Sequence, residues 1–496
     1  MGSVWLEGAS PPLTADAPSS VANRAWDLVV VGGGIVGLLC ALRAREAGHD
    51  VCVIEAERIG EGTSAHSTVK VTSGHGAVLA GIASRHGLAT ALAYQRANDA
   101  GFSRLAELVA ALPEPVGWTL SPHIVYATKP ESVEMLRTTE VLAQQAGSSL
   151  APCEPPSWTG APSWSWADSA LVQPLSLSRA LGRLLQSQGV PIVENARVVE
   201  VKDGSTSPRV RIEGGGEIRS RDVLIASHVP IHDPDVHALR VEVFRHPAIV
   251  VVPGSEVPAT YDVDGMSTRP VTLSDGRSGA VVVGPSHRAG AMTPDAWAEI
   301  RDWAASRLGT GDTTHQWAAQ DLRSFDRLPY VGRTRRSPRI LVATAMNGWG
   351  FTNAAAVADL LPEILDGGAH SGPPEPDRPD WTASRVYPSG GLRDAAHAMW
   401  WTGRNLVGDH ISSATQPDDT LRPGEGRVVG GPLSPRAECM TAEGICYAVS
   451  ARCTHMGCLV HWNEAEESWD CPCHGSRFRP NGDVIDGPAK AGLDPV

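Results

Sequence analysis

The chain has 496 residues, of which 20% are charged and 42% are hydrophobic, and its formal net charge at pH 7 is −13. At about 100–200 residues per domain, this length predicts about three folding units. The negative charge disfavours binding to nucleic acid or to an anionic membrane surface. Glycines interrupt the apolar run at residues 28–42, and the N-terminus lacks the pattern of a secretory signal. We therefore expect a cytoplasmic protein without membrane insertion.

The N-terminal part begins with a polar segment and continues as a β-α-β unit. Residues 1–24 are rich in Ser, Pro and Ala, which predicts a disordered leader. An apolar, β-branched strand follows at residues 27–31, then a helix at 35–47 and a second strand at 50–55. This order predicts a parallel sheet of the α/β class.

A glycine-rich turn joins the first strand to the helix. Gly32 permits the tight turn, Gly34 lets a pyrophosphate approach the backbone, and Gly37 lets the helix pack closely on the strand. Glu55 ends the second strand, 18 residues after Gly37, where a carboxylate accepts hydrogen bonds from a ribose hydroxyl. An acid at this position also argues against a 2′-phosphate. The pattern therefore predicts a site for a dinucleotide such as FAD or NAD.

Three further segments distinguish FAD from NAD. Residues 55–70, and the motifs at 326–332 (DRLPYVG) and 345–352 (AMNGWGFT), resemble those of the D-amino-acid oxidase and sarcosine oxidase superfamily. The resemblance covers residues 26–370 and implies that FAD is the cofactor. It implies the following additional contacts to FAD: Thr63, Ser64, His66, Val198, Gly348, Trp349, Gly350, Phe351 and Thr352.

Some residues of this region carry open alternatives. The spacing of His66 from Glu55 is similar to that of the histidine that binds flavin covalently in dimethylglycine and sarcosine dehydrogenases, and an unlinked histidine near the ring is the alternative. Lys70, His75 and His287 are candidate catalytic bases or electrostatic partners of the reduced flavin, with Lys70 preferred. The alternative for each is a hydrogen-bonded structural residue.

The resemblance and the composition together divide the chain. We expect a Rossmann-like FAD-binding domain of the glutathione-reductase type, interleaved with an α+β substrate domain. The FAD-binding domain takes residues 25–80, 171–234 and 326–370, and the substrate domain takes residues 81–170 and 235–325. A Pro- and Gly-rich linker at 371–409, with a possible short helix at 393–406, leads to a small all-β domain at 410–496.

The last domain carries two boxes of cysteine and histidine. Cys453 and His455 lie in the first box, and Cys471 and His474 lie in the second. Two thiolates and two imidazoles suit a 2Fe-2S cluster in which two histidines bind one iron. The alternative is structural zinc, which leaves Cys458 and Cys473 unexplained. The boxes match the Rieske family, and this resemblance implies that those four residues bind the cluster and that Cys458 and Cys473 form a disulfide.

The two cofactors together indicate a reaction type. FAD accepts two electrons as a hydride, whereas a Rieske cluster accepts one electron. By resemblance, we expect an enzyme that oxidises the C–N bond of a small amine or amino acid, and whose cluster passes electrons to an external carrier protein or quinone. One alternative is an electron-transfer component that serves a partner oxygenase or reductase, although no second glycine-rich turn for NAD(P)H is visible. A redox sensor is the other alternative.

Overall fold

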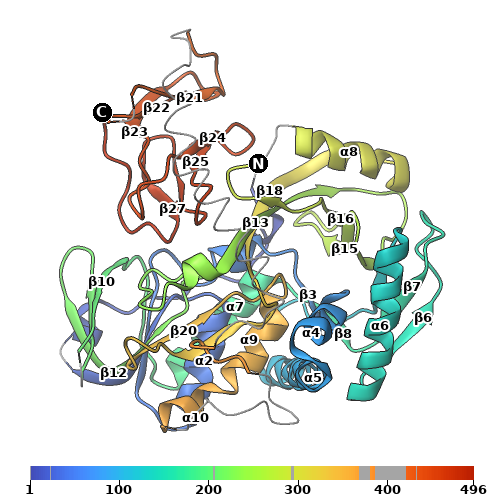
Figure 1. The fold of residues 1–496 in the computed structure, drawn as a ribbon, viewed down its shortest axis with the longest axis horizontal. Helices are drawn as coiled ribbons and strands as arrows, with labels where there is room; N and C mark the ends of the chain where they lie inside the picture. The colour runs from blue at the N-terminus through green and yellow to red at the C-terminus, as the bar shows by residue number, and fades with distance from the viewer. Residues whose placement is uncertain are drawn as a thin grey trace.

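A computed structural model describes residues 2–22, 24–204, 207–291, 295–367, 380–385, 420–431 and 433–496. The helix expected at residues 393–406, and most of the linker expected at 371–409, lie outside the described residues. Two large sheets form the body of the molecule, and a smaller domain, orange to red in Figure 1, lies at one end of it.

The first large sheet has eight strands, and its central strands are parallel. Its strands are β1 (Ala25–Val31), β2 (Val51–Ile54), β9 (Ile192–Val193), β10 (Val198–Lys202), β11 (Arg209–Ile212), β12 (Glu217–Ile225), β19 (Tyr330–Arg333) and β20 (Ile340–Thr344). The parallel neighbours run in the order β20, β12, β1, β2, β9. Their apolar side chains are buried on both faces, as expected for a parallel sheet covered by other elements.

Three helices pack together beside this sheet: α2 (Ile35–Glu46), α7 (Pro174–Ser187) and α9 (Gly350–Ala358). Because the carboxyl ends of parallel strands share one edge, the turns that follow β1, β2 and β12 meet there. Gly32 donates its backbone N–H to the carbonyl of Ile54, and Ala226 donates to Val31. This edge is where α/β proteins of this kind bind their ligands.

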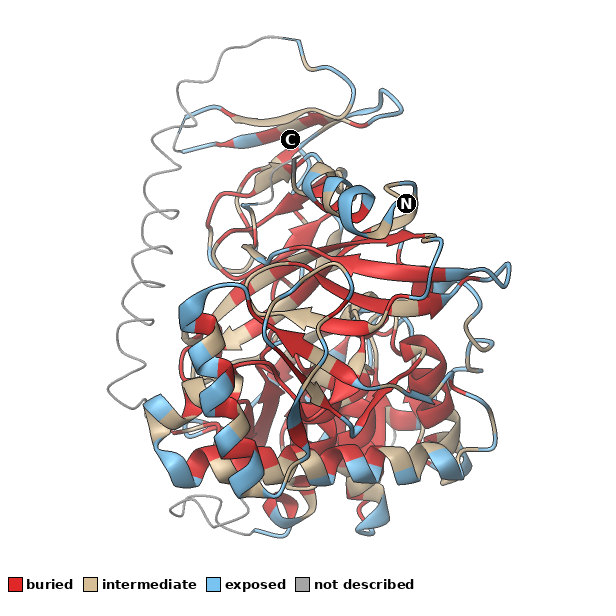
Figure 2. Cartoon of the chain, turned by 90° about the vertical axis from the view of Figure 1, so that its right-hand side faces the viewer, coloured by how far each residue is buried: buried red, intermediate tan, exposed pale blue. Residues whose placement is uncertain are grey.

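The second large sheet has nine strands and is mostly antiparallel. Its strands are β5 (His123–Tyr126), β6 (Leu150–Cys153), β7 (Ser163–Trp166), β13 (Val241–Val251), β14 (Ala259–Asp262), β15 (Ser267–Thr272), β16 (Ser278–Val283), β17 (His287–Arg288) and β18 (Thr313–Ser324). The long strands β13 and β18 pair along almost their whole length. Four longer helices lie outside the group that packs beside the first sheet: α4 (Val78–His86), α5 (Leu88–Ala111), α6 (Pro130–Ala146) and α8 (Asp295–Leu308). Figure 2 shows the buried residues concentrated in the strands and the exposed ones on outer helix faces.

The C-terminal domain is built from two small antiparallel sheets. One contains β21 (Gly426–Val429), β22 (Arg436–Met440) and β23 (Cys446–Ser450), and the other contains β24 (His461–Asn463), β25 (Ser468–Asp470), β26 (Arg477–Phe478) and β27 (Val484–Asp486). Trp469 and Phe478 are fully buried in its core. The domain lies against β13 and β18 of the second large sheet (Figure 1).

The N-terminal residues differ from the disordered leader that their composition predicts. A 3-10 turn, η1 (Val4–Leu6), buries Val4 and Trp5 to 4% and 3% exposure. The Trp5 indole donates a hydrogen bond to the carbonyl of Ser67, 2.7 Å away, and the Ser3 hydroxyl donates to the carbonyl of Ala65. The average composition of residues 1–24 did not indicate this packing, because the turn is buried through only two apolar side chains, those of Val4 and Trp5. In the described parts of the chain, no helix combines the length and apolarity needed to cross a membrane.

Candidate flavin cavity and iron-sulfur centre

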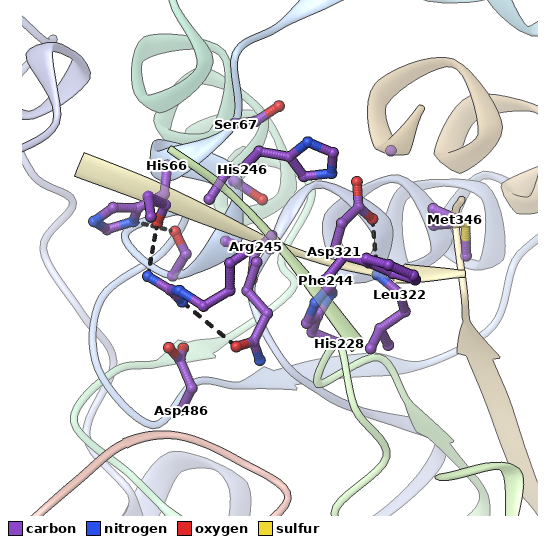
Figure 3. Close-up of a pocket in the computed structure, with 18 of the residues that line it drawn as sticks. His66, Ser67, His228, Phe244, Arg245, His246, Asp321, Leu322, Met346 and Asp486 are labelled. Atoms are coloured by element: carbon purple, nitrogen blue, oxygen red, sulfur yellow. Dashed lines mark hydrogen bonds between the residues drawn. The ribbon is translucent and has the colours of Figure 1, made fainter. Parts of the chain in front are cut away.

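One cavity of about 980 Å³ lies between the carboxyl edge of the first sheet, strands β13 and β18, and the C-terminal domain. Figure 3 shows part of its wall, where Phe244, His246 and Asp321 approach one another. The following residues expected to contact the cofactor line it: Gly32, Gly34, Glu55, Thr63, Ser64, His66, Val198, Gly348, Trp349, Gly350 and Phe351. Side chains from the C-terminal domain, including those of Glu466 and Asp486, also line it.

The glycine turn leaves the backbone open toward this cavity. Gly32 has a φ of +112°, and a Cβ there would lie 2.6 Å from the carbonyl oxygen of Ala226. A Cβ on Gly37 would lie only 2.0 Å from the carbonyl oxygen of Gly32. Helix α2 begins next to Gly34, so the partial positive charge of its N-terminus faces the cavity. This cradle fits a pyrophosphate.

Glu55 supports the same turn. One oxygen of its carboxylate accepts a hydrogen bond from the Gly33 N–H at 2.6 Å, and the other accepts from the Glu57 N–H at 2.9 Å. Burial raises the pKa of Glu55 above its ordinary value, although both hydrogen bonds favour the ionised carboxylate. Glu55 therefore lies where a ribose can reach it and also holds the glycine turn in place.

The remaining residues predicted to contact the cofactor fall into two groups: some line the cavity, and others do not reach it. Gly348, Trp349 and Gly350 line the cavity and place the N-terminus of α9 there, which favours negative charge on a ligand. Gly37 and Thr352 do not line it; the Thr352 hydroxyl donates a hydrogen bond to the Thr72 carbonyl at 2.7 Å. In His66, Nδ1 lies 2.9 Å from the Gly62 carbonyl while the residue lines the cavity. The open glycine cradle, the acid and the cavity volume fit FAD.

The close contact at Gly37 leads to a testable result. We expect a Gly37→Ala variant to purify without bound FAD, because its Cβ would collide with the Gly32 carbonyl and separate α2 from β1. The ratio of flavin absorbance to protein, with circular dichroism as a check of folding, measures this. Gly160→Ala is the matched control, since a Cβ there meets nothing within 4 Å. Full FAD content in Gly37→Ala would contradict the predicted cradle.

Of the three candidate catalytic residues, Lys70 lines the cavity. Strand β3 (Lys70–Thr72) begins at this lysine, and Nζ donates a hydrogen bond to the Thr260 carbonyl at 2.8 Å. Burial, together with the smaller effect of the nearby Arg269 guanidinium, lowers the pKa of Lys70 to about 7. A lysine with such a pKa exchanges a proton near neutral pH.

The other two candidates, His75 and His287, are not among the residues that line the cavity. Both ring nitrogens of His75 are occupied, by the Tyr94 hydroxyl at 2.7 Å and the Thr72 carbonyl at 2.9 Å. Its ring stacks on the Trp349 indole with centroids 4.8 Å apart, so His75 supports the cavity wall from behind. Burial lowers the pKa of His75 to about 3. His287 lies on β17 opposite Arg245, toward the C-terminal domain.

The sequence patterns missed Arg323, which lines the cavity from β18. Its guanidinium packs over the Phe244 ring, 4.3 Å from the ring centroid, and forms no ion pair among the described residues. Asp321 lines the same wall, and burial raises its pKa to about 6. No motif marks Arg323, because its position against the cavity depends on the pairing of β18 with β13.

The two cysteine and histidine boxes meet at one end of the C-terminal domain. The thiols of Cys453 and Cys471 are buried and interact, and their hydrogen bond lowers the pKa of Cys453 to about 7. The ring centroids of His455 and His474 lie 5.0 Å apart. Nδ1 of His455 and both ring nitrogens of His474 are buried without a hydrogen-bond partner among the described residues. Two adjoining thiols and these unpartnered imidazoles fit a cluster bound by two cysteines and two histidines.

The remaining cysteines of the boxes form the pair that the resemblance implies. Cys458 and Cys473 are joined by a disulfide, which connects the two cluster loops and leaves Cys453 and Cys471 free. These cysteines are well separated from the scattered Cys40 and Cys52, which are buried thiols within the first domain.

Comparisons with known proteins agree with this geometry. The FAD dependent oxidoreductase family model matches residues 27–364, and the Rieske [2Fe-2S] domain model matches residues 422–496. The Bacillus subtilis (strain 168) protein YhfW, whose name describes a Rieske 2Fe-2S iron-sulfur protein, is 28% identical over 490 residues, which cover 96% of this chain and 95% of YhfW.

Solved structures resemble the first part of the chain. Glycine oxidase from Geobacillus kaustophilus has a TM-score of 0.60 at 16% identity and covers 73% of this chain and 100% of its own. L-proline dehydrogenase from P. horikoshii has a TM-score of 0.60 at 15% identity; the match covers 71% of this chain and 96% of the dehydrogenase chain. These likenesses show the fold. The chain belongs to the FAD-dependent oxidoreductase family, with FAD as its cofactor and a C-terminal Rieske domain that binds a 2Fe-2S cluster.

Proposed function

We propose that this oxidoreductase oxidises the C–N bond of a small amine or amino acid, and that electrons leave one at a time through the Rieske cluster to an external carrier protein or quinone. Cytoplasmic location is part of the proposal. The observation that carries it is the pair of cationic groups, Lys70 and Arg323, in one cavity with the glycine cradle. The proteins of similar fold include a glycine oxidase and a proline dehydrogenase, which supports this substrate class.

The residues that line the cavity have separate roles in the proposed reaction. The Arg323 guanidinium has donors for a substrate carboxylate, and its contact with Phe244 orients it. Lys70, held by the Thr260 carbonyl, accepts a proton from the substrate ammonium. The rings of Tyr261 and Trp349, with centroids 5.3 Å apart, exclude water from the space between them. When bound, FAD supplies the acceptor for the hydride of the C–H bond next to nitrogen.

The Lys70 pKa predicts a pH dependence. At saturating substrate, the rate of flavin bleaching is expected to rise as pH increases through about 7, because a lysine with a lowered pKa loses its proton there and becomes a base. Lys70→Met should remove this rise. Asp321 and Asp262 face the same cavity with pKa values raised to about 6, so any step near pH 6 should persist in the variant. An unchanged step near pH 7 in Lys70→Met would contradict the assignment.

An anaerobic visible titration tests the function itself. The purified protein is mixed with a panel of N-methyl, cyclic and D- and L-amino acids while the flavin and cluster bands are recorded. Bleaching of the flavin followed by reduction of the cluster supports the proposal. If NADH bleaches the flavin and no amine does, the chain acts as an electron-transfer component for a partner oxygenase or reductase. If neither an amine nor NADH reduces the flavin, the result favours the redox-sensor hypothesis.

A further inference from the structure

Strands β13 and β18 contact both the cavity, which they line together with residues of the C-terminal domain, and the Rieske domain itself. Their register pairs Phe244 with Asp321 and Arg245 with Gln320. Because side chains alternate along a strand, neighbouring pairs point to opposite faces. Figure 3 shows Arg245 extending to one side of these strands and Asp321 to the other. The Arg245 and Gln320 side chains are therefore available to the domain that packs on the far face.

Arg245 forms the first contact with that domain. It is 1% exposed, and its Nη2 donates hydrogen bonds to the carboxylate of Glu466, in the turn between β24 and β25, at 2.6 Å to one oxygen. The same nitrogen donates to the Ala318 carbonyl at 3.2 Å, and Nη1 lies 3.5 Å from the side-chain oxygen of Gln320. A guanidinium this deeply buried is tolerated because Glu466 neutralises it.

Gln320 forms the second contact, beside the cluster. Its Nε2 donates a hydrogen bond to the carbonyl of Gly475 at 3.1 Å, and the residue is 4% exposed. Gly475 directly follows His474. A Cβ on Gly475, whose φ is +76°, would lie 2.5 Å from Cγ1 of Val243, so the cluster loop rests directly on β13. Gln320 lines the cavity, as do its chain neighbours Ala319 and Asp321.

These contacts form a continuous chain of atoms from the cavity wall to a cluster ligand: backbone of β18, Gln320 amide, Gly475 carbonyl, His474. We propose that the cross-strand pair Arg245 and Gln320 anchors the cluster loop to the flavin cavity, and that electrons pass to the cluster across the Gln320–Gly475 hydrogen bond. Both are positioning residues. This inference rests on the proposed direction of electron flow and names its route within the chain.

The number of electrons transferred in each turnover determines what the contact between the cluster loop and the cavity wall must allow. Oxidation of one substrate molecule leaves two electrons on the flavin, and the cluster takes one electron at a time by reduction of one ferric ion. An external one-electron acceptor, a carrier protein or a quinone, must therefore reoxidise the cluster twice in each turnover. A cluster loop held against the cavity wall permits two successive transfers without separation of the domains.

Gln320→Leu tests the route without any substrate. Laser-flash photoreduction with a deazaflavin donor places one electron on the flavin of the holoenzyme, and the cluster band then reports the intramolecular transfer. We expect transfer to slow severalfold, because the variant loses the hydrogen bond that joins β18 to the cluster loop. The midpoint potentials of flavin and cluster, and the spectrum of the reduced cluster in electron paramagnetic resonance, are expected to stay unchanged.

Gln316→Leu is the matched control. Gln316 lies on the same face of β18, and its side chain accepts a hydrogen bond from Arg301 of α8 at 3.3 Å, with no hydrogen bond to the described part of the Rieske domain. Transfer at the wild-type rate in this control, together with slow transfer in Gln320→Leu, supports the inference. An unchanged rate in Gln320→Leu overturns it, and so does a slow rate that accompanies a shifted cluster potential.

If Gln320→Leu does not fold, a second variant tests the same proposal. Glu466→Gln keeps the shape of the side chain and removes the charge that faces Arg245, so the anchor weakens without a cavity. Slower transfer with unchanged potentials supports the anchor, and wild-type transfer overturns it. Since neither experiment uses a substrate, failure of the amine panel affects the proposed function and leaves this test intact.

Discussion

Replacement of Arg323 by Met is expected to raise the Kd of a carboxylate-bearing substrate about 10–100-fold, because a hydrogen bond to a charged group contributes about 1.5–3 kcal/mol. The guanidinium lines the cavity and packs on Phe244, and it forms no ion pair among the described residues, although the Asp321 carboxylate interacts with it electrostatically. The dependence of flavin bleaching on substrate concentration, measured anaerobically by stopped flow, gives this Kd. The rate at saturation should change less than the Kd, since Arg323 binds a group that does not react.

Two controls separate binding of the carboxylate from a general loss of structure. An amine that lacks the carboxylate should bind the variant and the wild type alike. Arg211→Met removes an arginine that is 55% exposed on β11 and should leave both substrates unaffected. An equal loss for both substrates in Arg323→Met would contradict the assignment, because it would show that the cavity itself had changed.

Replacement of His474 by Ala is expected to abolish reduction of a one-electron acceptor while flavin bleaching by substrate persists. His474 is 2% exposed, and its ring nitrogens have no partner among the described residues, so one of them is available to bind the iron of the cluster. Removal of one of four ligands should release the iron on purification. Iron content and the signal of the reduced cluster in electron paramagnetic resonance measure the first effect, and acceptor reduction measures the second.

The matched control is His461→Ala on β24, a histidine of the same domain that lies outside the two boxes. It should keep two irons per chain, as expected for one 2Fe-2S cluster. Zinc in place of iron in the wild-type protein would revive the structural-zinc alternative. Acceptor reduction at the wild-type rate in His474→Ala would contradict the Rieske outlet, because electrons would then leave directly from the flavin.

The flavin and cluster motifs could be predicted because their residues are close in sequence. Gly32, Gly34 and Gly37 lie between a strand and a helix; Gly32 has a positive φ, and a Cβ on Gly37 would collide with the Gly32 carbonyl oxygen. The histidines at 455 and 474 each lie within three residues of a ligand cysteine, so spacing alone indicated a shared site. The parallel pairing of β1 with β2 also agrees with the predicted β-α-β unit, since such connections place successive parallel strands side by side.

Other features depended on contacts between distant segments. Trp5 is buried because a long-range hydrogen bond to Ser67 holds it, which the polar composition of residues 1–24 obscured. His75 has the residue type of a base, yet Tyr94 and Thr72 occupy both of its nitrogens.

The sequence by itself determined the two cofactor sites, because local spacing specifies their ligands. Only the tertiary structure decided that Arg323 faces the cavity and that Gln320 meets Gly475, 155 residues away, since the pairing of β13 with β18 and the packing of the Rieske domain set which way each side chain points.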